Sequence, residues 1–324
     1  MDGWYSVGAT FPPVLLEQPD NERITKIHEM RARIAGQGFI KLVVAEELYD
    51  CRPNHSAGEL TEEHGTLACN SIIASIEPSN FQSTTRNDQK DAAKAIEITF
   101  GRQIHTDGYH QTKESLVSMD APVLPRKTDS QNVSPSLKDG RNTRWSFRQL
   151  GDLESTIGYK FKDRDLLEGP QFILQRLEFL GDAVLGYLVS RHLFLYPAQF
   201  QQVDDICKIK KAIECNKNLS KISAINGLHK FLEISSKIKS NINSFIESEM
   251  DGKAPKIIAD VFEILICAVY LDCNRNLDEV WRVFYPFLEE HMEEIIGQTV
   301  PNDAKNCRAD CRDHLHPARM CLNP

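Results

Sequence analysis

Apolar residues recur at helical spacing along most of the chain, in two groups that a polar stretch separates. Apolar positions three or four residues apart lie on one face of an α-helix, so this spacing predicts helices. The alternation of apolar and polar residues that predicts strands is almost absent. We therefore expect an all-α fold. The predicted helices cover residues 34–48, 60–76 and 91–104 before the polar stretch and 147–167, 173–194, 204–225, 255–272 and 277–296 after it.

The polar stretch, residues 108–144, is rich in Pro, Ser, Asp and Lys and has no sustained periodicity. Such a segment is typical of a disordered linker. The last residues of the chain also lack periodicity, which favours a disordered tail. The expected organisation is a helical domain at 1–107, a flexible linker at 108–146, a second helical domain at 147–296 and a tail at 297–324.

Size and composition agree with two packed domains. The chain has 324 residues, 41% of them hydrophobic, and a mean hydropathy of −0.38, which favours folded domains with some long polar segments. The net charge is −8. This charge has the wrong sign for a protein that holds nucleic acid by its overall charge, so any such surface must be local.

Targeting features are not recognisable in the sequence. No apolar run is long enough to span a bilayer, and the first residues, MDGWYSVGATF, lack the basic and apolar regions of a secretory signal. The nine cysteines are an odd number without a spaced framework, which favours reduced thiols. We expect no membrane partner and a cytoplasmic or nuclear location.

Two pairs of carboxylates lie within strongly apolar helical segments. Glu178 and Asp182 are four residues apart, and Asp260 and Glu263 are three residues apart, so each pair lies on one face of its helix. Either pair alone is equally consistent with a salt bridge to Lys or Arg on a neighbouring helix. Together, four buried carboxylates without His or Cys favour Mg²⁺ or Mn²⁺ over zinc. Such a site is typical of metal-assisted phosphodiester hydrolysis.

The segments that contain these pairs resemble two motifs of the ribonuclease III family, and the last nuclease domain of Dicer in particular. The first is QRLEFLGDAVL, and Gln175 in it is Dicer-like; the second is PKIIADVFEILICAVYLD. The flanking segments LESTIGYKFKDRDLL and LDEVWRVFYPFLEEHM resemble the opening and closing helices of that domain, so the resemblance covers residues 147 to about 292.

The resemblance implies an all-α domain that cuts double-stranded RNA with Mg²⁺ or Mn²⁺. Domains of this family act in pairs, in which each site cuts one strand. By resemblance, Lys256 contacts the scissile phosphate. The metal ligands are Glu178, Asp182, Asp260 and Glu263.

Three departures from the family pattern bear on activity. The stretch around ALTHxS, which normally forms a helix beside the active site, is reduced to EGPQF. Cys267 replaces the Gly that allows close helix packing, and its side chain is expected to crowd the site. Gly186 lies inside the predicted helix 173–194, where glycine costs about 1 kcal/mol relative to Ala.

A local basic surface is also present. Residues 208–239 contain eight lysines against two glutamates, a local charge of +6. A solvated helix face explains such a run, but next to the carboxylates it also fits contacts to RNA phosphates, with the duplex recognised by its shape. The expected RNA-binding residues are Lys208, Lys210, Lys211 and Lys217.

The first half resembles a degenerate ribonuclease III domain, in GFIKLVVAEELYDCRPNHSAGELTEEHGTLACNSIIAS and KDAAKAIEITFGRQIHTDG. If ARIAGQG is aligned with LEFLGDA, the first half has other residues at three of the four ligand positions and keeps the carboxylate at the fourth. The chain is expected to pair its two halves intramolecularly or to form a homodimer; the alternative is an unrelated helical domain. The four aligned positions are Arg33, Gln37, Lys94 and Glu97.

Three functions remain open from the sequence. The first is a Mg²⁺-dependent endonuclease of double-stranded RNA whose second half cleaves. The second is a catalytically silent module that binds RNA or dimerises, and the third is a helical assembly factor of a ribonucleoprotein. The tail contains zinc-type ligands whose spacing matches no compact finger. They are Cys307, Cys311, His314, His316 and Cys321.

Overall fold

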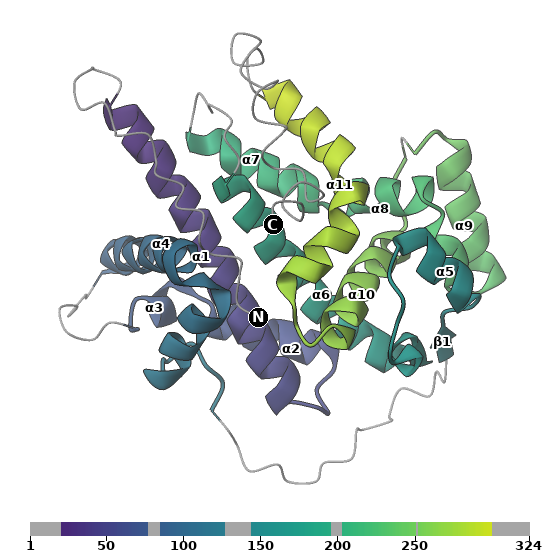
Figure 1. Ribbon diagram of the computed structural model, residues 1–324, viewed down its shortest axis with the longest axis horizontal. Helices are drawn as coiled ribbons and strands as arrows, with labels where there is room; N and C mark the ends of the chain where they lie inside the picture. The colour runs from purple at the N-terminus through teal and green to yellow at the C-terminus, as the bar shows by residue number, and fades with distance from the viewer. Residues whose placement is uncertain (1–20, 77–84, 127–143, 196–202, 251, 300–324) are drawn as a thin grey trace, which may run out of the picture.

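The computed structural model describes residues 21–76, 85–126, 144–195, 203–250 and 252–299 (Figure 1). These residues are mostly helical, which confirms the all-α class; two three-residue strands form one antiparallel pair. The predicted zinc-type residues of the tail lie outside the described residues. The elements are α1 Asn21–Cys51, α2 Ala57–Leu67, α3 Asn70–Ile73, α4 Arg86–Ser118, β1 Arg144–Ser146, α5 Leu150–Ile157, η1 Arg164–Leu167, β2 Glu168–Pro170, α6 Gln171–Leu195, α7 Val203–Glu214, α8 Asn216–Ile225, η2 Leu228–Phe231, α9 Ser236–Glu247, α10 Lys256–Asp272 and α11 Leu277–Thr299.

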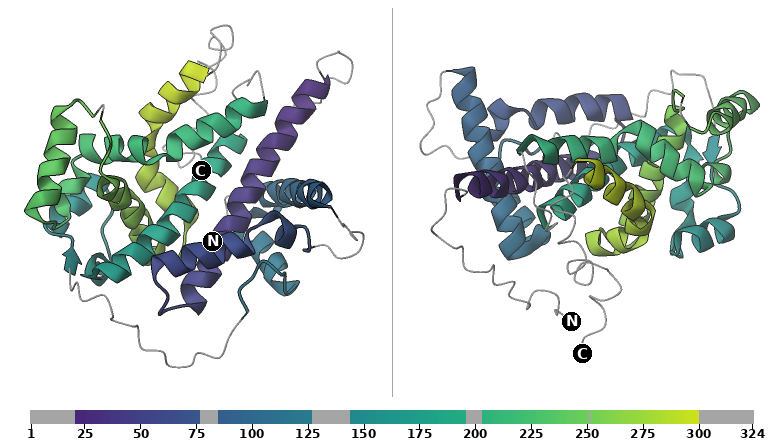
Figure 2. Two further views of the ribbon diagram at one scale, coloured as in Figure 1. Left: turned by 180° about the vertical axis from the view of Figure 1, so that it is seen from behind. Right: turned by 90° about the horizontal axis from the view of Figure 1, so that it is seen from above.

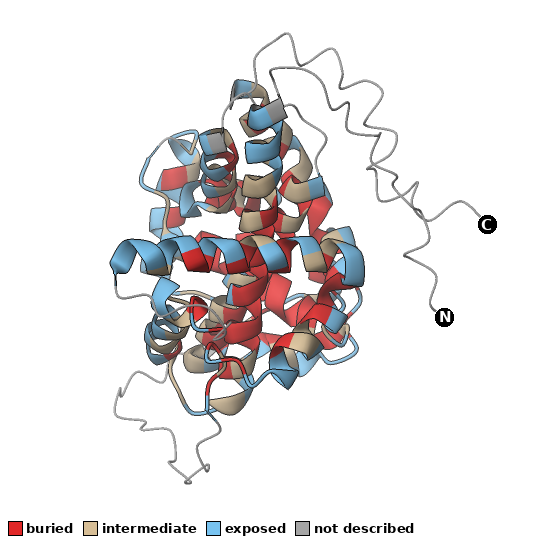
Figure 3. Cartoon of the chain, turned by 90° about the vertical axis from the view of Figure 1, so that its left-hand side faces the viewer, coloured by how far each residue is buried: buried red, intermediate tan, exposed pale blue. Residues whose placement is uncertain are grey.

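The two halves of the chain share one hydrophobic core. We call the elements α1 to α4 the first half and the elements from β1 onward the second half. Helices α1 and α6 lie side by side at the junction, with α4 against the outer side of α1 and α10 against α6 (Figures 1 and 2). One continuous set of buried side chains runs from Ile34 in α1 to Ile296 in α11. Buried residues line the inner helix faces, and exposed residues lie on the outer ones (Figure 3).

The packing across the junction is reciprocal. Helix α2 follows α1 in the chain and packs against both α1 and α6. Helix α7 follows α6 and packs against both α6 and α1. Each half therefore places a helix on the central helix of the other half, so separating the halves would expose two sets of buried side chains.

In each half, the central helix crosses its partner helix at a glycine. A Cβ atom on Gly36 of α1 would overlap the backbone carbonyl of Glu97 in α4. A Cβ atom on Gly181 of α6 would overlap the carbonyl of Glu263 in α10, and it would lie 3.3 Å from the Cβ of Cys267. Cys267 is fully buried, and its side chain fits because residue 181 is glycine.

Arg176 of α6 fastens the second half to the end of α1. The arginine is 4% exposed. One terminal nitrogen donates to the carbonyls of Arg52 at 2.8 Å and His55 at 2.6 Å, and the other donates to the carbonyl of Tyr49 at 2.8 Å. The carbonyls of Tyr49 and Arg52 lie at the C-terminal end of α1, where a cation is favourable, and the carbonyl of His55 lies in the turn before α2. The contact fixes the start of α6 relative to the first half.

A buried carboxylate, Glu46 of α1, joins the halves a second time. Glu46 is 1% exposed and accepts hydrogen bonds from the hydroxyls of Tyr109 in α4 and Tyr270 in α10. It also accepts one from Nζ of Lys113 at 3.0 Å. These donors offset the cost of burying a charge, so the two halves share one polar contact inside their common core.

The linker prediction was wrong at its start. Helix α4 continues to Ser118, and Leu116 and Val123 are buried in the core. The reason is a kink at Gly108, with φ 82° and ψ 170°, a conformation that suits glycine. The kink changes which face of the helix is apolar, so the sequence showed no sustained period. Residues 127–143 of the predicted linker lie outside the described residues.

Three predicted helices also differ in detail. The expected helix at 60–76 is two helices, α2 and α3. The expected helix at 147–167 is interrupted: α5 ends at Ile157, and Gly158 caps it with φ 66°, a left-handed conformation common after helices. The expected helix at 204–225 is two helices, α7 and α8, with Cys215 between them. Among the described residues, no helix is both long and apolar enough to cross a membrane.

The two kinds of glycine environment predict opposite effects of one methyl group. Gly36→Ala should lower the free energy of unfolding by about 2–3 kcal/mol, because the methyl group overlaps the backbone of α4. Gly186→Ala should raise it by about 1 kcal/mol, because its nearest neighbour, Lys210 Nζ, is 3.8 Å away. Urea denaturation of both variants measures the difference; equal effects would contradict the close crossing.

The hydrogen bonds of Arg176 predict that its replacement has a large effect on stability. Arg176→Met should lower the free energy of unfolding by about 3 kcal/mol, because three part-buried carbonyls, those of Tyr49, Arg52 and His55, are left without their donor. The matched control is Arg282→Met, since Arg282 forms an exposed ion pair with Glu279, and it should change stability by about 0.5 kcal/mol or less. Similar decreases in urea denaturation would show that Arg176 does not fasten the halves.

Candidate metal centre

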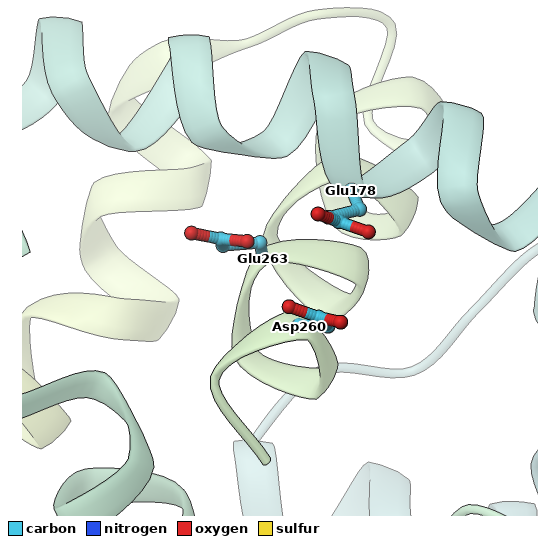
Figure 4. A group of neighbouring side chains, drawn as sticks. All are labelled: Glu178, Asp260 and Glu263. Atoms are coloured by element: carbon cyan, nitrogen blue, oxygen red, sulfur yellow. The ribbon is translucent and has the colours of Figure 1, made fainter. Parts of the chain in front are cut away.

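Three of the predicted carboxylates come together where α6 crosses α10. Glu178 lies on α6, while Asp260 and Glu263 lie on neighbouring turns of α10 (Figure 4). Each offers one oxygen within 4.8 Å of the oxygens of the other two. The close crossing at Gly181 brings the two helices near enough for this approach. We call Glu178, Asp260 and Glu263 the carboxylate cluster.

Asp182, the fourth predicted ligand, lies beside the cluster. It follows Glu178 by one helical turn, its side chain is exposed, and it is outside the group whose oxygens lie within 4.8 Å of one another. After burial, its negative charge is the strongest influence that raises the pKa of Glu263, so the two carboxylates are close enough to repel. The role of Asp182 as a metal ligand stays a prediction.

Burial makes the cluster unfavourable without a cation. Asp260 and Glu263 are each 6% exposed. Burial, together with the nearby charge of Glu178, raises the pKa of Asp260 to about 6. Burial and the charges of Asp182 and Asp260 raise the pKa of Glu263 to about 9. The cluster therefore holds a proton at neutral pH or requires positive charge next to it.

Lys256 supplies part of that positive charge. It is the first residue of α10, and its Nζ donates to Glu178 and, at 2.8 Å, to Asp260. Burial acts to lower the pKa of Lys256, but these hydrogen bonds outweigh burial and raise it. Its side chain is 60% exposed. Lys256 thus lies between the carboxylates and solvent, where an anionic ligand would approach.

The donors of the cluster fit a hard divalent ion. All three ligands are carboxylate oxygens, the type that Mg²⁺ and Mn²⁺ prefer, whereas zinc sites typically contain His or Cys. Glu263 has no hydrogen bond or ion pair to any other described residue, which leaves both of its oxygens free to bind an ion. The residues present therefore fit Mg²⁺ or Mn²⁺, with Glu178, Asp260 and Glu263 as the ligands that converge.

The predicted RNA-binding lysines fall into two groups. Lys210 of α7 is half-buried and forms an ion pair with Glu214 of the same helix, so its charge is largely neutralised. Lys208 lies 3.5 Å from Asp205 but is 67% exposed. Lys211 on α7 and Lys217 on α8 are exposed. Their contact with RNA stays a prediction.

The residues of the first half that align with the carboxylates form a different arrangement. Nε of Arg33 donates to Glu97 at 2.8 Å across the crossing of α1 and α4. Glu97 is 1% exposed, the side chain of Arg33 is 30% exposed, and Lys94 is exposed. Arg33, which aligns with Glu178, therefore neutralises the buried carboxylate of Glu97.

Sequence reasoning missed one neighbour of the cluster. His64 of α2 packs the edge of its ring against Phe179, with the ring centres 5.9 Å apart. Its Nε2 lies 3.0 Å from the carbonyl oxygen of Lys41. Phe179 is adjacent to Glu178, so a residue of the first half lies next to the site. No local pattern marks His64, because the contact depends on how the halves pack.

Residues 175–274 match the family model of the ribonuclease III domain, and all three residues of the carboxylate cluster lie in this range. The chain carries a ribonuclease III domain. Endoribonuclease dcr-1 of Caenorhabditis elegans is 27% identical over an alignment of 266 residues that covers 67% of this chain and 14% of that protein. Endoribonuclease Dicer of Danio rerio is 25% identical over an alignment of 256 residues that covers 63% of this chain and 14% of that protein.

A shorter relative matches mainly the second half. Ribonuclease 3-like protein 3 of Oryza sativa subsp. japonica is 34% identical over an alignment of 157 residues that covers 42% of this chain and 52% of that protein. The chain thus spans about half of this relative and about one seventh of the two Dicers. The similarity to Dicer extends well beyond the ribonuclease III domain itself.

The raised pKa of Glu263 predicts how stability depends on pH without metal. The unfolded chain releases this proton near pH 4.5, whereas the folded chain keeps it to about pH 9. Between about pH 5 and 9 the unfolded state therefore binds fewer protons, and the free energy of unfolding falls as pH rises. Glu263→Gln should be more stable than the native sequence in EDTA at the alkaline end of this range, with a flatter pH profile.

Urea denaturation at several pH values, with EDTA present, measures this effect. The matched control is Glu247→Gln, because Glu247 is exposed on α9. The control should follow the native profile. A Glu263→Gln profile that also matches the native one would contradict the raised pKa.

Proposed function

We propose that the second half is a Mg²⁺-dependent endonuclease of double-stranded RNA. The observation that carries this proposal is the convergence of Glu178, Asp260 and Glu263 at the crossing of α6 and α10, inside the matched ribonuclease III domain. The names of the relatives, endoribonucleases and Dicer proteins, support the same class of reaction. Two buried carboxylates at this crossing are otherwise an unexplained cost in stability.

The carboxylates and Lys256 have different roles in the proposed reaction. When bound, divalent ions activate a water molecule and stabilise the leaving oxygen. The carboxylate cluster holds these ions, and Asp182 at its exposed edge is the ligand nearest to solvent. Lys256 is largely exposed beside the cluster, so its Nζ can turn from the carboxylates to a phosphate oxygen of RNA, where its charge offsets the charge of the reacting phosphate.

We also propose that the first half is a degenerate ribonuclease III domain that pairs with the second half. Three observations support this. The central helices α1 and α6 both cross a partner helix at a glycine, next to a glutamate, Glu97 or Glu263. Helices α2 and α7 pack reciprocally on the opposite central helix. The similarity to the worm Dicer covers 67% of this chain, more than the second half alone.

The degenerate half leaves one site for cleavage. Arg33, Gln37 and Lys94 stand where the second half has Glu178, Asp182 and Asp260, so the first half lacks three of four ligands. Helix α1 packs along α6, so within this chain the second half is already paired with the first half. The expected product is therefore a duplex with a nick in one strand.

A second candidate is a catalytically silent module that binds RNA. The observation that favours it lies between α5 and α6, where the described residues form a 3-10 turn and strand β2 but no α-helix. The family resemblance implies a helix at this place beside the site. Binding of duplex RNA that survives removal of Mg²⁺, without cleavage at any Mg²⁺ or Mn²⁺ concentration, would favour this candidate.

The nuclease proposal predicts Mg²⁺-dependent nicking. The purified chain should cut one strand of a labelled RNA duplex, and EDTA should stop the reaction. Asp182→Asn and Glu263→Gln should each lower the rate at least about 100-fold, because the site loses a carboxylate, and should leave RNA binding largely unchanged. Denaturing gels resolve nicked strands, and native gels resolve intact duplexes.

The control and the contrary outcomes are distinct. Glu247→Gln on α9 changes the same charge away from the site and should cleave normally. Double-strand cuts that appear only as protein concentration rises would show that two second halves pair in a homodimer. A gel with neither nicks nor double cuts in Mg²⁺ or Mn²⁺ would reject the nuclease proposal.

A further inference from the structure

The first half carries cations at the positions that correspond to the carboxylate cluster. Because Gly36 and Gly181 cross equivalent turns of α4 and α10, Glu97 corresponds to Glu263, and Lys94 corresponds to Asp260. One turn before Lys94, Lys90 corresponds to Lys256. With Arg33, these residues carry a charge of +2, from three cations and one carboxylate. In the second half, one lysine and four carboxylates, including Asp182, give −3.

The three cations are presented to solvent. Nε of Arg33 is engaged by Glu97, while its two terminal nitrogens have no partner among the residues that the structure describes. Lys90 and Lys94 are exposed on α4, four residues apart and so on one face of the helix. Within the same described part of the chain, neither lysine has an ion pair. We call Arg33, Lys90 and Lys94 the basic counterpart.

The geometry of Arg33 suits a phosphate. A carboxylate that holds Nε fixes the plane of the guanidinium group, and the two terminal nitrogens then form a fork that matches two phosphate oxygens. Glu97 is 1% exposed, so its charge is shielded from solvent by the arginine that it orients. The site therefore presents positive charge without needing a metal ion.

Helix α7 of the second half extends the basic surface. It packs against α1, and its Cys207 is near enough to Arg33 for the charge of the arginine to act on the thiol: burial raises the pKa of Cys207, and Arg33 opposes that rise. Lys211 lies one turn after Cys207 on the same face of α7 and is exposed. Both halves thus contribute cations around Arg33.

We propose that the basic counterpart binds a backbone phosphate of the RNA strand that the second half does not cut. This inference rests on the proposed function, in which each half of the pair faces one strand of a duplex. In the first half, a direct contact between cations and phosphate replaces the contact through a metal ion. The degenerate half then acts as an anchor that holds the duplex in register for a single cut.

Binding in the absence of metal tests the proposal. The experiment uses the full chain with Asp182→Asn, which prevents cleavage, and a fluorescent blunt-ended RNA duplex in EDTA. Replacing both Lys90 and Lys94 by Gln should weaken binding about tenfold at moderate salt. The slope of log K against log salt should fall by about 2, because each lysine no longer neutralises a phosphate. Fluorescence anisotropy measures both quantities.

Two further variants separate binding from folding. Arg33→Met with Glu97→Gln removes the ion pair without leaving a buried charge, and it should weaken RNA binding while thermal unfolding remains cooperative. The matched control replaces Lys160 and Lys162, two exposed lysines that follow α5 on the opposite side of the molecule from α4 (Figures 1 and 2). The control should keep the native affinity. An equal decrease in affinity for the control and for the Lys90 and Lys94 variant would overturn the proposal.

Uncharged phosphates identify the strand. Methylphosphonate groups are placed one at a time along each strand of the duplex, and the nicked strand is identified separately with the native sequence in Mg²⁺. A methylphosphonate that weakens binding by the Asp182→Asn chain, but not by the variant that also lacks Lys90 and Lys94, marks the contacted phosphate. The proposal requires this phosphate on the uncut strand; a position on the cut strand would overturn it.

The experiments distinguish failure of the anchor proposal from failure of the nuclease proposal. A chain whose RNA affinity depends on Lys90 and Lys94, but which never nicks RNA, rejects the nuclease proposal alone. A chain that nicks RNA with an unchanged KM and salt dependence after both lysines are replaced rejects the anchor alone.

Discussion

The close crossing of α6 and α10 at Gly181 is the constraint on which the site depends. Without a side chain at residue 181, the backbone of α10 approaches α6 near Glu263, and Glu178 comes within reach of two carboxylates on the other helix. A larger residue would force the helices apart and separate the oxygens. The crossing also explains why Cys267 is tolerated, since the space that its side chain needs is left by the same glycine.

The crossing buries several carboxylates away from water, and the rest of the site compensates for their negative charge. Burial raises the pKa of Asp260 to about 6 and of Glu263 to about 9. Lys256 neutralises the outer part of the cluster, while Glu263 lies deeper and contacts no cationic side chain that the structure describes. This gradient, from lysine at the exposed side to an unpaired carboxylate inside, is what a divalent ion would complete.

Both halves contain the same kind of helix crossing, but the residues around it carry a net positive charge in the first half and a net negative charge in the second. In the first half Arg33 neutralises Glu97 directly, and the surrounding lysines make the surface positive. In the second half the carboxylates are held together by the fold. Arg176 and Glu46, whose side chains are almost fully buried, join the two halves. The positions of the two surfaces relative to each other are therefore fixed. The protein can therefore present a basic surface locally although its overall charge is −8.

The sequence by itself determined the helical class, the two carboxylate pairs and the family of the second half. Each depends on local information: the period of apolar residues, the spacing of acids on one helix, and two motifs. The tertiary structure decided the rest. It set Asp182 apart from the three converging carboxylates, continued α4 past a kink at Gly108 and brought His64 beside Phe179. These depend on which helix faces meet, and helix faces meet through contacts between residues far apart in the chain, which no local pattern records.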